Sequence, residues 1–152
     1  MSNTNEITRR TWIGMMGAVT ATFGKDLVEG VNKARNGLAV KGYDTVAYQQ
    51  QGKAVKGNPA FAAQHDGANY LFTSAANRDA FTADPERYAP QFGGYCAWAV
   101  GHGYTADIDP EAWHVADGKL YLNYNKSVQG MWLKDKAKWI GEAVRNWPGL
   151  HK

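Results

Sequence analysis

The dipeptide Asp117-Gly118 constrains the fold of this chain more than any other short segment. It separates two strand-like runs, 113–116 and 119–124. Asp-Gly is a preferred sequence for the mirror-image two-residue turn that joins antiparallel strands. In the second run Leu120 and Leu122 share one face, because successive side chains of a strand alternate. A second pair, Asp66-Gly67, precedes the aromatic run 69–73. The sequence therefore predicts antiparallel strands joined by tight turns.

Helix starts are predicted where a short polar residue precedes proline. The polar side chain can cap the first backbone N–H groups, and proline suits the first helical position. This pattern occurs at Asn58-Pro59, Asp84-Pro85 and Asp109-Pro110. Ser74 is a further predicted cap, for a helix through Phe81. The run 45–48 is predicted to be a short strand, because it is rich in β-branched and aromatic residues.

A long amphipathic helix is predicted near the C-terminus, from Ser127 to Trp147. Its apolar residues recur at spacings of three, four and seven, as on one buried face of a helix. Pro148-Gly149 would end it. No internal repeat is evident. The expected fold is α+β, with a short antiparallel sheet packed by helices and this long helix at the end.

The N-terminal segment has the order of an export signal. Arg9 and Arg10 precede an uncharged run, 11–24, which is too short to span a bilayer as a helix. The paired arginines resemble a twin-arginine signal. We therefore expect an export signal over 1–24, a linker or leading helix over 25–37 and one domain over 38–148. The predicted location is periplasmic or secreted, without a stable membrane span.

Composition excludes some partners. The 152 residues are 44% hydrophobic and carry a formal net charge of only +3. That charge is too small and too dispersed for the clustered basic face of a nucleic-acid-binding protein. No nucleic-acid partner is expected. The sequence specifies no protein partner.

Several segments together resemble the YHS domain family. The stretch 70–88 has an aromatic strand, a helix containing Phe81 and a Pro-x-x-Tyr segment, while 41–48 resembles the opening of such domains. The segments 93–97 and 120–124 are similar to elements of exported bacterial members. The resemblance implies a small α+β domain, often linked to heavy-metal handling. The paired cysteines of metal-linked members correspond here to Thr73 and Asn77, and the opening cysteine is also absent.

The candidate metal ligands are Cys96, His102 and Asp44. Cys96 is the only cysteine and follows Gly93-Gly94, and a thiolate there could bind copper or zinc. The alternative for Cys96 is a small buried hydrophobic residue. His102 lies six residues later, and Asp44 is a carboxylate in an aromatic setting whose commoner role is a cap or turn hydrogen bond. His65, before a turn, is expected to be solvated.

No catalytic motif is present in the sequence, which favours a binding protein over an enzyme. The first hypothesis is an exported protein that binds a metal ion or a small ligand. The second is a structural or protein-interaction module without catalysis. The third is a thiol-dependent redox enzyme or sensor that uses Cys96.

Overall fold

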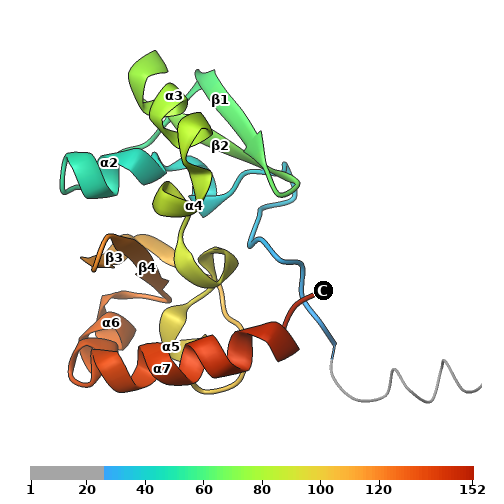
Figure 1. Cartoon of the computed structure of the whole chain (residues 1–152), viewed down its shortest axis with the longest axis vertical. Helices are drawn as coiled ribbons and strands as arrows, with labels where there is room; N and C mark the ends of the chain where they lie inside the picture. The colour runs from blue at the N-terminus through green and yellow to red at the C-terminus, as the bar shows by residue number, and fades with distance from the viewer. Residues whose placement is uncertain (1–25) are drawn as a thin grey trace, which may run out of the picture.

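The computed structural model describes residues 26–152, so the predicted export signal lies outside the described residues. Within that range the fold is α+β as predicted, but it has two separate two-stranded antiparallel sheets instead of one (Figure 1). No helix of the described range is long and apolar enough to cross a membrane. The elements are α2 (Thr45–Gln50), β1 (Asn58–His65), β2 (Ala68–Phe72), α3 (Ala75–Ala83), α4 (Pro85–Tyr88), α5 (Ala97–Gly101), β3 (Asp109–Ala116), β4 (Lys119–Asn123), α6 (Lys126–Leu133) and α7 (Lys136–Asn146).

Both predicted Asp-Gly turns are confirmed. Asp66 and Gly67 have φ of 49° and 77°, and Asp117 and Gly118 have φ of 52° and 71°. Positive φ at both central residues is the mirror-image turn that matches the right-handed twist of paired strands. The first turn joins β1 to β2 and the second joins β3 to β4.

Two of the three predicted helix starts are wrong. Asn58 and Asp109 begin strands, and only Pro85 begins a helix, α4. The local hydrogen bond is nevertheless the expected kind, since Asn58 Oδ1 accepts from the Ala60 N–H at 2.9 Å and Asp109 Oδ1 from the Glu111 N–H at 2.9 Å. Each bond closes a short turn beside an irregularity in the strand register. The same side-chain chemistry therefore serves a turn in place of a helix cap.

The predicted strand over 45–48 is also wrong, because these residues form α2. Asp44 accepts hydrogen bonds from the Val46 and Ala47 N–H groups and so caps this helix. Capping and burial override the β-propensity of the run. Ser74 caps α3 as predicted, through a 3.1 Å bond from the Asn77 N–H.

The predicted long C-terminal helix is divided in two. α6 ends at Leu133 and α7 begins at Lys136, with a non-helical Asp135 (φ −145°) between them. α6 packs against β3 and β4, whereas α7 packs against α5. One straight helix cannot follow both surfaces, so tertiary packing breaks it.

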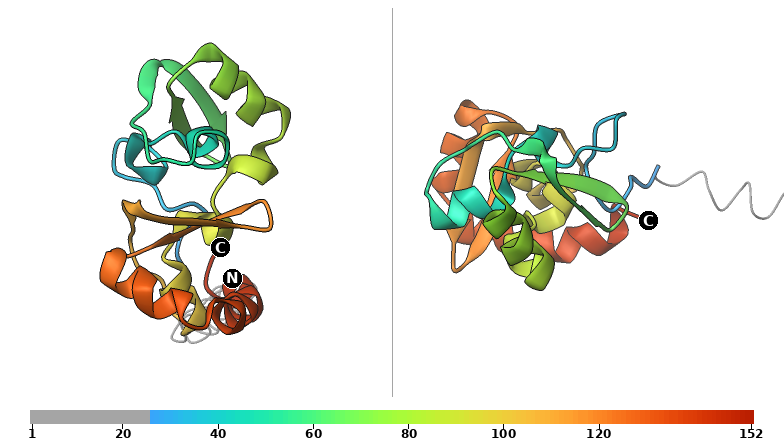
Figure 2. Two further views of the ribbon diagram at one scale, coloured as in Figure 1. Left: turned by 90° about the vertical axis from the view of Figure 1, so that its left-hand side faces the viewer. Right: turned by 90° about the horizontal axis from the view of Figure 1, so that it is seen from above.

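The fold contains an internal repeat, contrary to the sequence-based expectation. A first unit (residues 40–83) and a second unit (residues 91–133) each contain a positive-φ turn, a short helix, a bulged hairpin and a capped helix. Turn residues Val40, Lys41 and Gly42 correspond to Phe92, Gly93 and Gly94, all with positive φ. The hairpins share even the place of the register shift, at Asn58/Ala62 and Asp109/Trp113. The first unit lies above the second in Figure 1 and in the left-hand view of Figure 2.

Residues 26–39 form an extended segment that we call the strap, and they contain no helix. Of the two expectations for 25–37, a linker or a leading helix, the helix is not found over residues 26–37. Val28 bonds to both Leu150 and Lys152, Asn32 bonds to Gly93, and Ala39 bonds to Asn69. The strap thus connects the C-terminal segment, the second unit and β2 through backbone hydrogen bonds.

The hydrophobic interior has two clusters that meet at β4. Leu120 and Leu122, which share one face as predicted, belong to the larger cluster with the side chains of the first unit. Tyr121, on the opposite face, belongs to the cluster with Trp132 and Ala143. Because β4 is buried on both faces, it joins the two units into one body.

Candidate functional site

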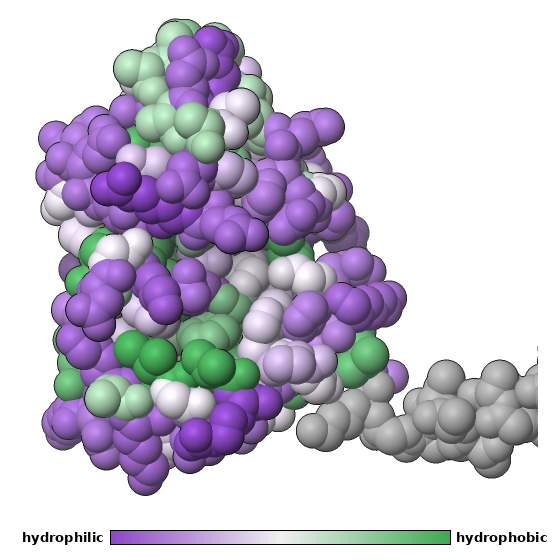
Figure 3. Space-filling model, viewed as in Figure 1, coloured by the Kyte–Doolittle hydropathy of each residue, from purple (hydrophilic) through white to green (hydrophobic). Residues whose placement is uncertain are grey.

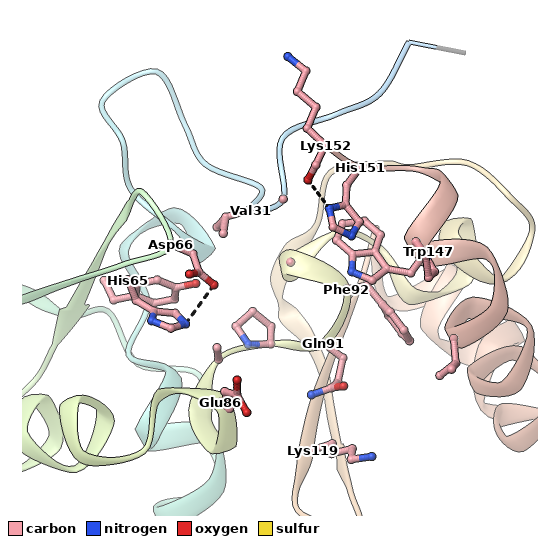
Figure 4. Close-up of a pocket in the computed structure, with 17 residues that line it drawn as sticks. Val31, His65, Asp66, Glu86, Gln91, Phe92, Lys119, Trp147, His151 and Lys152 are labelled. Carbon is pink, nitrogen blue, oxygen red and sulfur yellow. Dashed lines mark hydrogen bonds and ion pairs between the residues drawn. The ribbon is translucent and has the colours of Figure 1, made fainter. Parts of the chain in front are cut away.

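A groove of about 890 Å³ lies between the two units. One wall comes from the β1–β2 turn, β2 and α4, and the opposite wall comes from the β3–β4 hairpin, α7 and the C-terminal segment (Figure 4). Its floor is formed by Gln91, Phe92, Gly93 and the strap residues Gly30 and Val31. This volume lies within the range of small-molecule sites, roughly 300–1,000 Å³.

A histidine–aspartate pair stands on the first wall. His65 Nε2 lies 3.2 Å from Asp66 Oδ2, and the imidazole contacts Phe81 edge-on at 5.8 Å between ring centroids. Tyr70 lies beside it and is only 2% exposed. Burial, with a smaller effect from the Asp66 carboxylate, raises the pKa of Tyr70 to about 12. The phenol is therefore neutral at physiological pH.

An aromatic stack forms the opposite wall. The His151 imidazole stacks on the Trp147 indole, with ring centroids 4.2 Å apart, and Phe92 meets the same indole edge-on at 6.4 Å. His151 Nδ1 is 2.7 Å from the main-chain oxygen of Lys152. Because that oxygen can only accept, Nδ1 carries the hydrogen of this bond. The two histidines face each other across open space in Figure 4.

The floor requires glycine at position 93. Gly93 has φ of +62°, and a Cβ built there would lie 2.0 Å from the Gly30 carbonyl oxygen of the strap. The close approach lets the Asn32 N–H donate to the Gly93 carbonyl oxygen at 2.8 Å. Strap and floor are thus in direct backbone contact, which closes one side of the groove.

Cys96 is buried, not exposed to the groove. It is 1% exposed, and its Sγ accepts from the Tyr124 N–H at 3.2 Å and lies 3.6 Å from Asn123 Oδ1. Burial raises the pKa of the Cys96 thiol, although backbone hydrogen bonds from α5 and Tyr124 act in the opposite direction. The thiol is thus protonated at neutral pH and enclosed, as in the alternative weighed from the sequence.

His102 lies on the surface at the end of α5. Its ring stacks on Trp139, with centroids 4.0 Å apart, and lies 4.2 Å from the Trp98 ring. Its Nδ1 is 2.7 Å from the Trp98 carbonyl oxygen. The ring and one of its nitrogens are therefore engaged within the protein, although His102 is exposed.

Asp44 is fully buried and accepts five hydrogen bonds. Oδ1 accepts from Val46 and Ala47 of α2. Oδ2 accepts from the Thr73 N–H, the Thr73 hydroxyl and the Asn77 amide, each at 2.8 Å. The predicted capping role of Asp44 is confirmed. Both of its carboxylate oxygens accept hydrogen bonds from groups of the protein itself.

The structure does not bring Cys96, His102 and Asp44 into one cluster. Among residues 26–152 no three His, Cys, Asp or Glu side chains lie where they could hold a metal ion. The positions that correspond to cysteines in metal-linked YHS domains, Thr73 and Asn77, are hydrogen-bonded to Asp44 and to each other. Hydroxyl, amide and carboxyl oxygens that satisfy one another do not fit a soft metal ion.

Asp44 and Cys96 nevertheless hold equivalent positions in the two units. Each immediately precedes the short helix of its unit and accepts a backbone hydrogen bond from the residue just after the second hairpin strand, Thr73 or Tyr124. In each unit a single residue separates this position from the preceding three-residue positive-φ turn. Cys96 is therefore the structural counterpart of a capping aspartate.

Scans of family models, curated proteins and solved structures find no match to this chain.

Sequence reasoning missed the groove and most of its residues. His65 was expected to be solvated, yet its side chain is only 25% exposed, and Trp147 was expected to pack in the core as part of the apolar face of the C-terminal helix. A local signal did exist for one wall, since Trp147 and His151 are four residues apart and can share a helical face. No local signal places that wall opposite His65.

Proposed function

We propose that this chain is an exported protein that binds a small organic ligand in the groove between its two units. The observation that carries the proposal is the groove itself, whose volume of about 890 Å³ fits a small molecule. Apolar and aromatic residues there stand beside charged, imidazole and amide side chains, so the groove offers a ligand both apolar surface and polar contacts. We also propose that the fold is a YHS-like arrangement used twice, which the repeated hairpin and helix support.

Export is proposed from the sequence pattern around Arg9 and Arg10, so the binding would take place in the periplasm or outside the cell. The metal hypothesis gains no support from Cys96, His102 or Asp44, because each has its partners within the protein. The redox hypothesis needs an accessible thiolate, whereas Cys96 is buried and its pKa is raised. A small-ligand site therefore fits the geometry better than either.

Native mass spectrometry of the full chain, expressed and exported in a bacterial host, tests the proposal. We expect a mass increment from a bound small molecule, which denaturation releases. Val144 lines the groove from α7 and is 60% exposed, so Val144→Trp fills part of the groove without disturbing the interior. This variant should lose the increment.

Met131→Trp is the matched control, because Met131 is 44% exposed on α6 and does not line the groove. It should keep the increment. The groove proposal is wrong if the wild-type chain carries no small molecule and binds none from a metabolite extract, or if Val144→Trp and Met131→Trp retain ligand equally. Fractionation of the same cells tests export, and a wholly cytoplasmic chain of unaltered mass would contradict it.

A further inference from the structure

We infer that the groove binds a zwitterion of the amino-acid type with an apolar or aromatic side chain. The inference rests on the proposed function and names the chemical class of its ligand. It follows from the distribution of charge and apolar surface over the two walls.

Negative charge lies on the wall of the first unit. Asp66 follows β1 and Glu86 lies in the first turn of α4, and Figure 4 shows both on the same side of the groove. Tyr70 lines this wall, and its hydroxyl forms no hydrogen bond among those that the structure describes for residues 26–152. The Asp66 carboxylate lies 3.2 Å from His65 Nε2, whereas Glu86 takes part in none of the ion pairs found within residues 26–152. Glu86, with the neutral Tyr70 phenol on the same wall, is therefore the acceptor available for a ligand ammonium group.

Positive charge lies on the opposite wall, at the β3–β4 hairpin. Lys119 is exposed and lines the groove, and it takes part in none of the ion pairs found within residues 26–152. Lys152 also lines the groove, but its ammonium lies 3.3 Å from Glu29 of the strap. Lys119 is therefore the cation available for a ligand carboxylate, with the Gln91 amide on the same side in Figure 4.

Apolar surface lies beside this cation. The His151–Trp147 stack, Phe92 and Val144 line the same wall. Figure 3 shows that apolar side chains gather along α7 on a face that is otherwise largely polar. An apolar or aromatic side chain would be removed from water there, which favours binding.

Other ligand classes fit this distribution less well. A polyanion such as a nucleic acid would meet two carboxylates on one wall, and a simple amine would use the charge of one wall only. A metal ion has no cluster of ligands in the described part of the chain. Only a ligand with both charges is complementary to both walls.

Isothermal titration calorimetry of the full chain with three probes of one shape tests the inference. The probes are L-phenylalanine, phenethylamine and 3-phenylpropionate, which present both charges, the ammonium alone and the carboxylate alone. We expect L-phenylalanine to bind about fivefold more tightly than either analogue, since each partly shielded charge contact contributes about 1 kcal/mol.

Charge-removing variants assign the two contacts. Lys119→Gln should abolish the preference for L-phenylalanine over phenethylamine, and Glu86→Gln should reduce its preference over 3-phenylpropionate. Lys126→Gln and Asp135→Asn remove exposed charges that do not line the groove, and they should leave both preferences unchanged. Circular dichroism confirms that each variant is folded.

The outcomes separate this inference from the proposed function. If a small molecule is detected in the groove but none of the three probes binds, or if phenethylamine binds as well as L-phenylalanine, the zwitterion class is wrong and the ligand site stands. If neither a native ligand nor any probe binds, both fail. If Lys119→Gln and Lys126→Gln behave alike, Lys119 is not the carboxylate contact and the inference is overturned.

Discussion

The two units of this protein place different side chains at the position that immediately precedes their short helix. In the first unit Asp44 caps α2 and accepts five hydrogen bonds, three of them from Thr73 and Asn77. In the second unit Cys96 occupies the equivalent place, and its sulfur accepts from Tyr124. The Cys96 side chain forms no cap bond to α5, whose Trp98 N–H donates to Asn123 Oδ1 instead. The comparison teaches that a lone cysteine after paired glycines can be a packed residue at the N-cap position of a helix. Its position in a repeat explains it without a reactive site.

The two units also differ in how their equivalent turns are used. Lys41 and Gly93 correspond, and both have positive φ. Lys41 is exposed and lies 3.3 Å from Asp107, whereas Gly93 contacts the strap backbone and forms the floor of the groove. The close approach excludes a side chain only in the second unit. The groove therefore depends on a difference between the repeats.

Removing the carboxylate of the first unit should have the largest effect on stability. Asp44→Ala leaves two N–H groups of α2 and the Thr73 and Asn77 donors without their acceptor in a fully buried place. Unpartnered buried polar groups are costly, so we expect a loss of about 4 kcal/mol in the free energy of unfolding. Urea denaturation followed by circular dichroism measures it.

The control is Asp79→Ala, whose side chain is 70% exposed and pairs only with Arg78. It should change the free energy of unfolding by less than about 0.5 kcal/mol. If both variants lose the same free energy of unfolding, the hydrogen bonds to Asp44 do not stabilise the first unit.

Closing the contact between strap and floor should have the next largest effect. Gly93→Ala adds a Cβ that would lie 2.0 Å from the Gly30 carbonyl oxygen, at a φ of +62°. We expect a loss of about 3 kcal/mol in stability, together with faster proteolysis of the strap. Thermal denaturation and limited trypsin digestion measure the two effects.

Gly118→Ala separates backbone strain from the clash. Gly118 has φ of +71°, and a Cβ there meets no atom within 4 Å. Only the conformational cost remains, about 1 kcal/mol. If Gly93→Ala lowers the free energy of unfolding no more than Gly118→Ala does, the close contact between Gly93 and the strap does not restrict the side chain at this position.

Removing the thiol of the second unit should have the smallest effect at neutral pH. Cys96→Ala takes one small buried group from a packed site, and we expect a loss of about 1.5 kcal/mol. The pKa of Cys96 is raised in the folded state, so the folded chain keeps the proton above about pH 8.5, where an unfolded thiol releases it. Stability then falls as pH rises through this range.

The difference between wild type and Cys96→Ala isolates that effect, because all other titrating groups are shared. The stability advantage of wild type should be constant below about pH 8 and should shrink above about pH 8.5. Denaturation curves at pH 7, 8.5 and 9.5 measure it. An advantage that grows with pH, or rapid alkylation of the native thiol at pH 7, would mean that Cys96 is ionised and accessible.

Much of the fold could be predicted from short patterns, and the errors have identifiable causes. The hairpins at Asp66-Gly67 and Asp117-Gly118, and the cap at Ser74, follow from preferences that act within a few residues. The Asn58-Pro59 pattern was assigned to a helix because a capping side chain and a turn-forming side chain make the same bond. Position in the repeat, not the dipeptide, decides between them.

The candidate site was less accessible to prediction. Asp44 was correctly expected to cap a turn or helix, because its hydrogen bonds are largely local. The repeat was missed because its two units share few identical residues, although they share the spacing of turns and caps. The groove was missed because its walls come from segments far apart in the chain.

The sequence by itself determined the turns, the α3 cap, the alternation of Leu120 and Tyr121 and the limited charge of the chain. These features depend on backbone stereochemistry and on contacts between near neighbours, which short patterns record. Only the tertiary structure decided that Cys96 is enclosed and that His65 faces His151 across a groove. The burial of Cys96 and the placement of His65 opposite His151 depend on packing between distant segments. β4 and the strap bring those segments together.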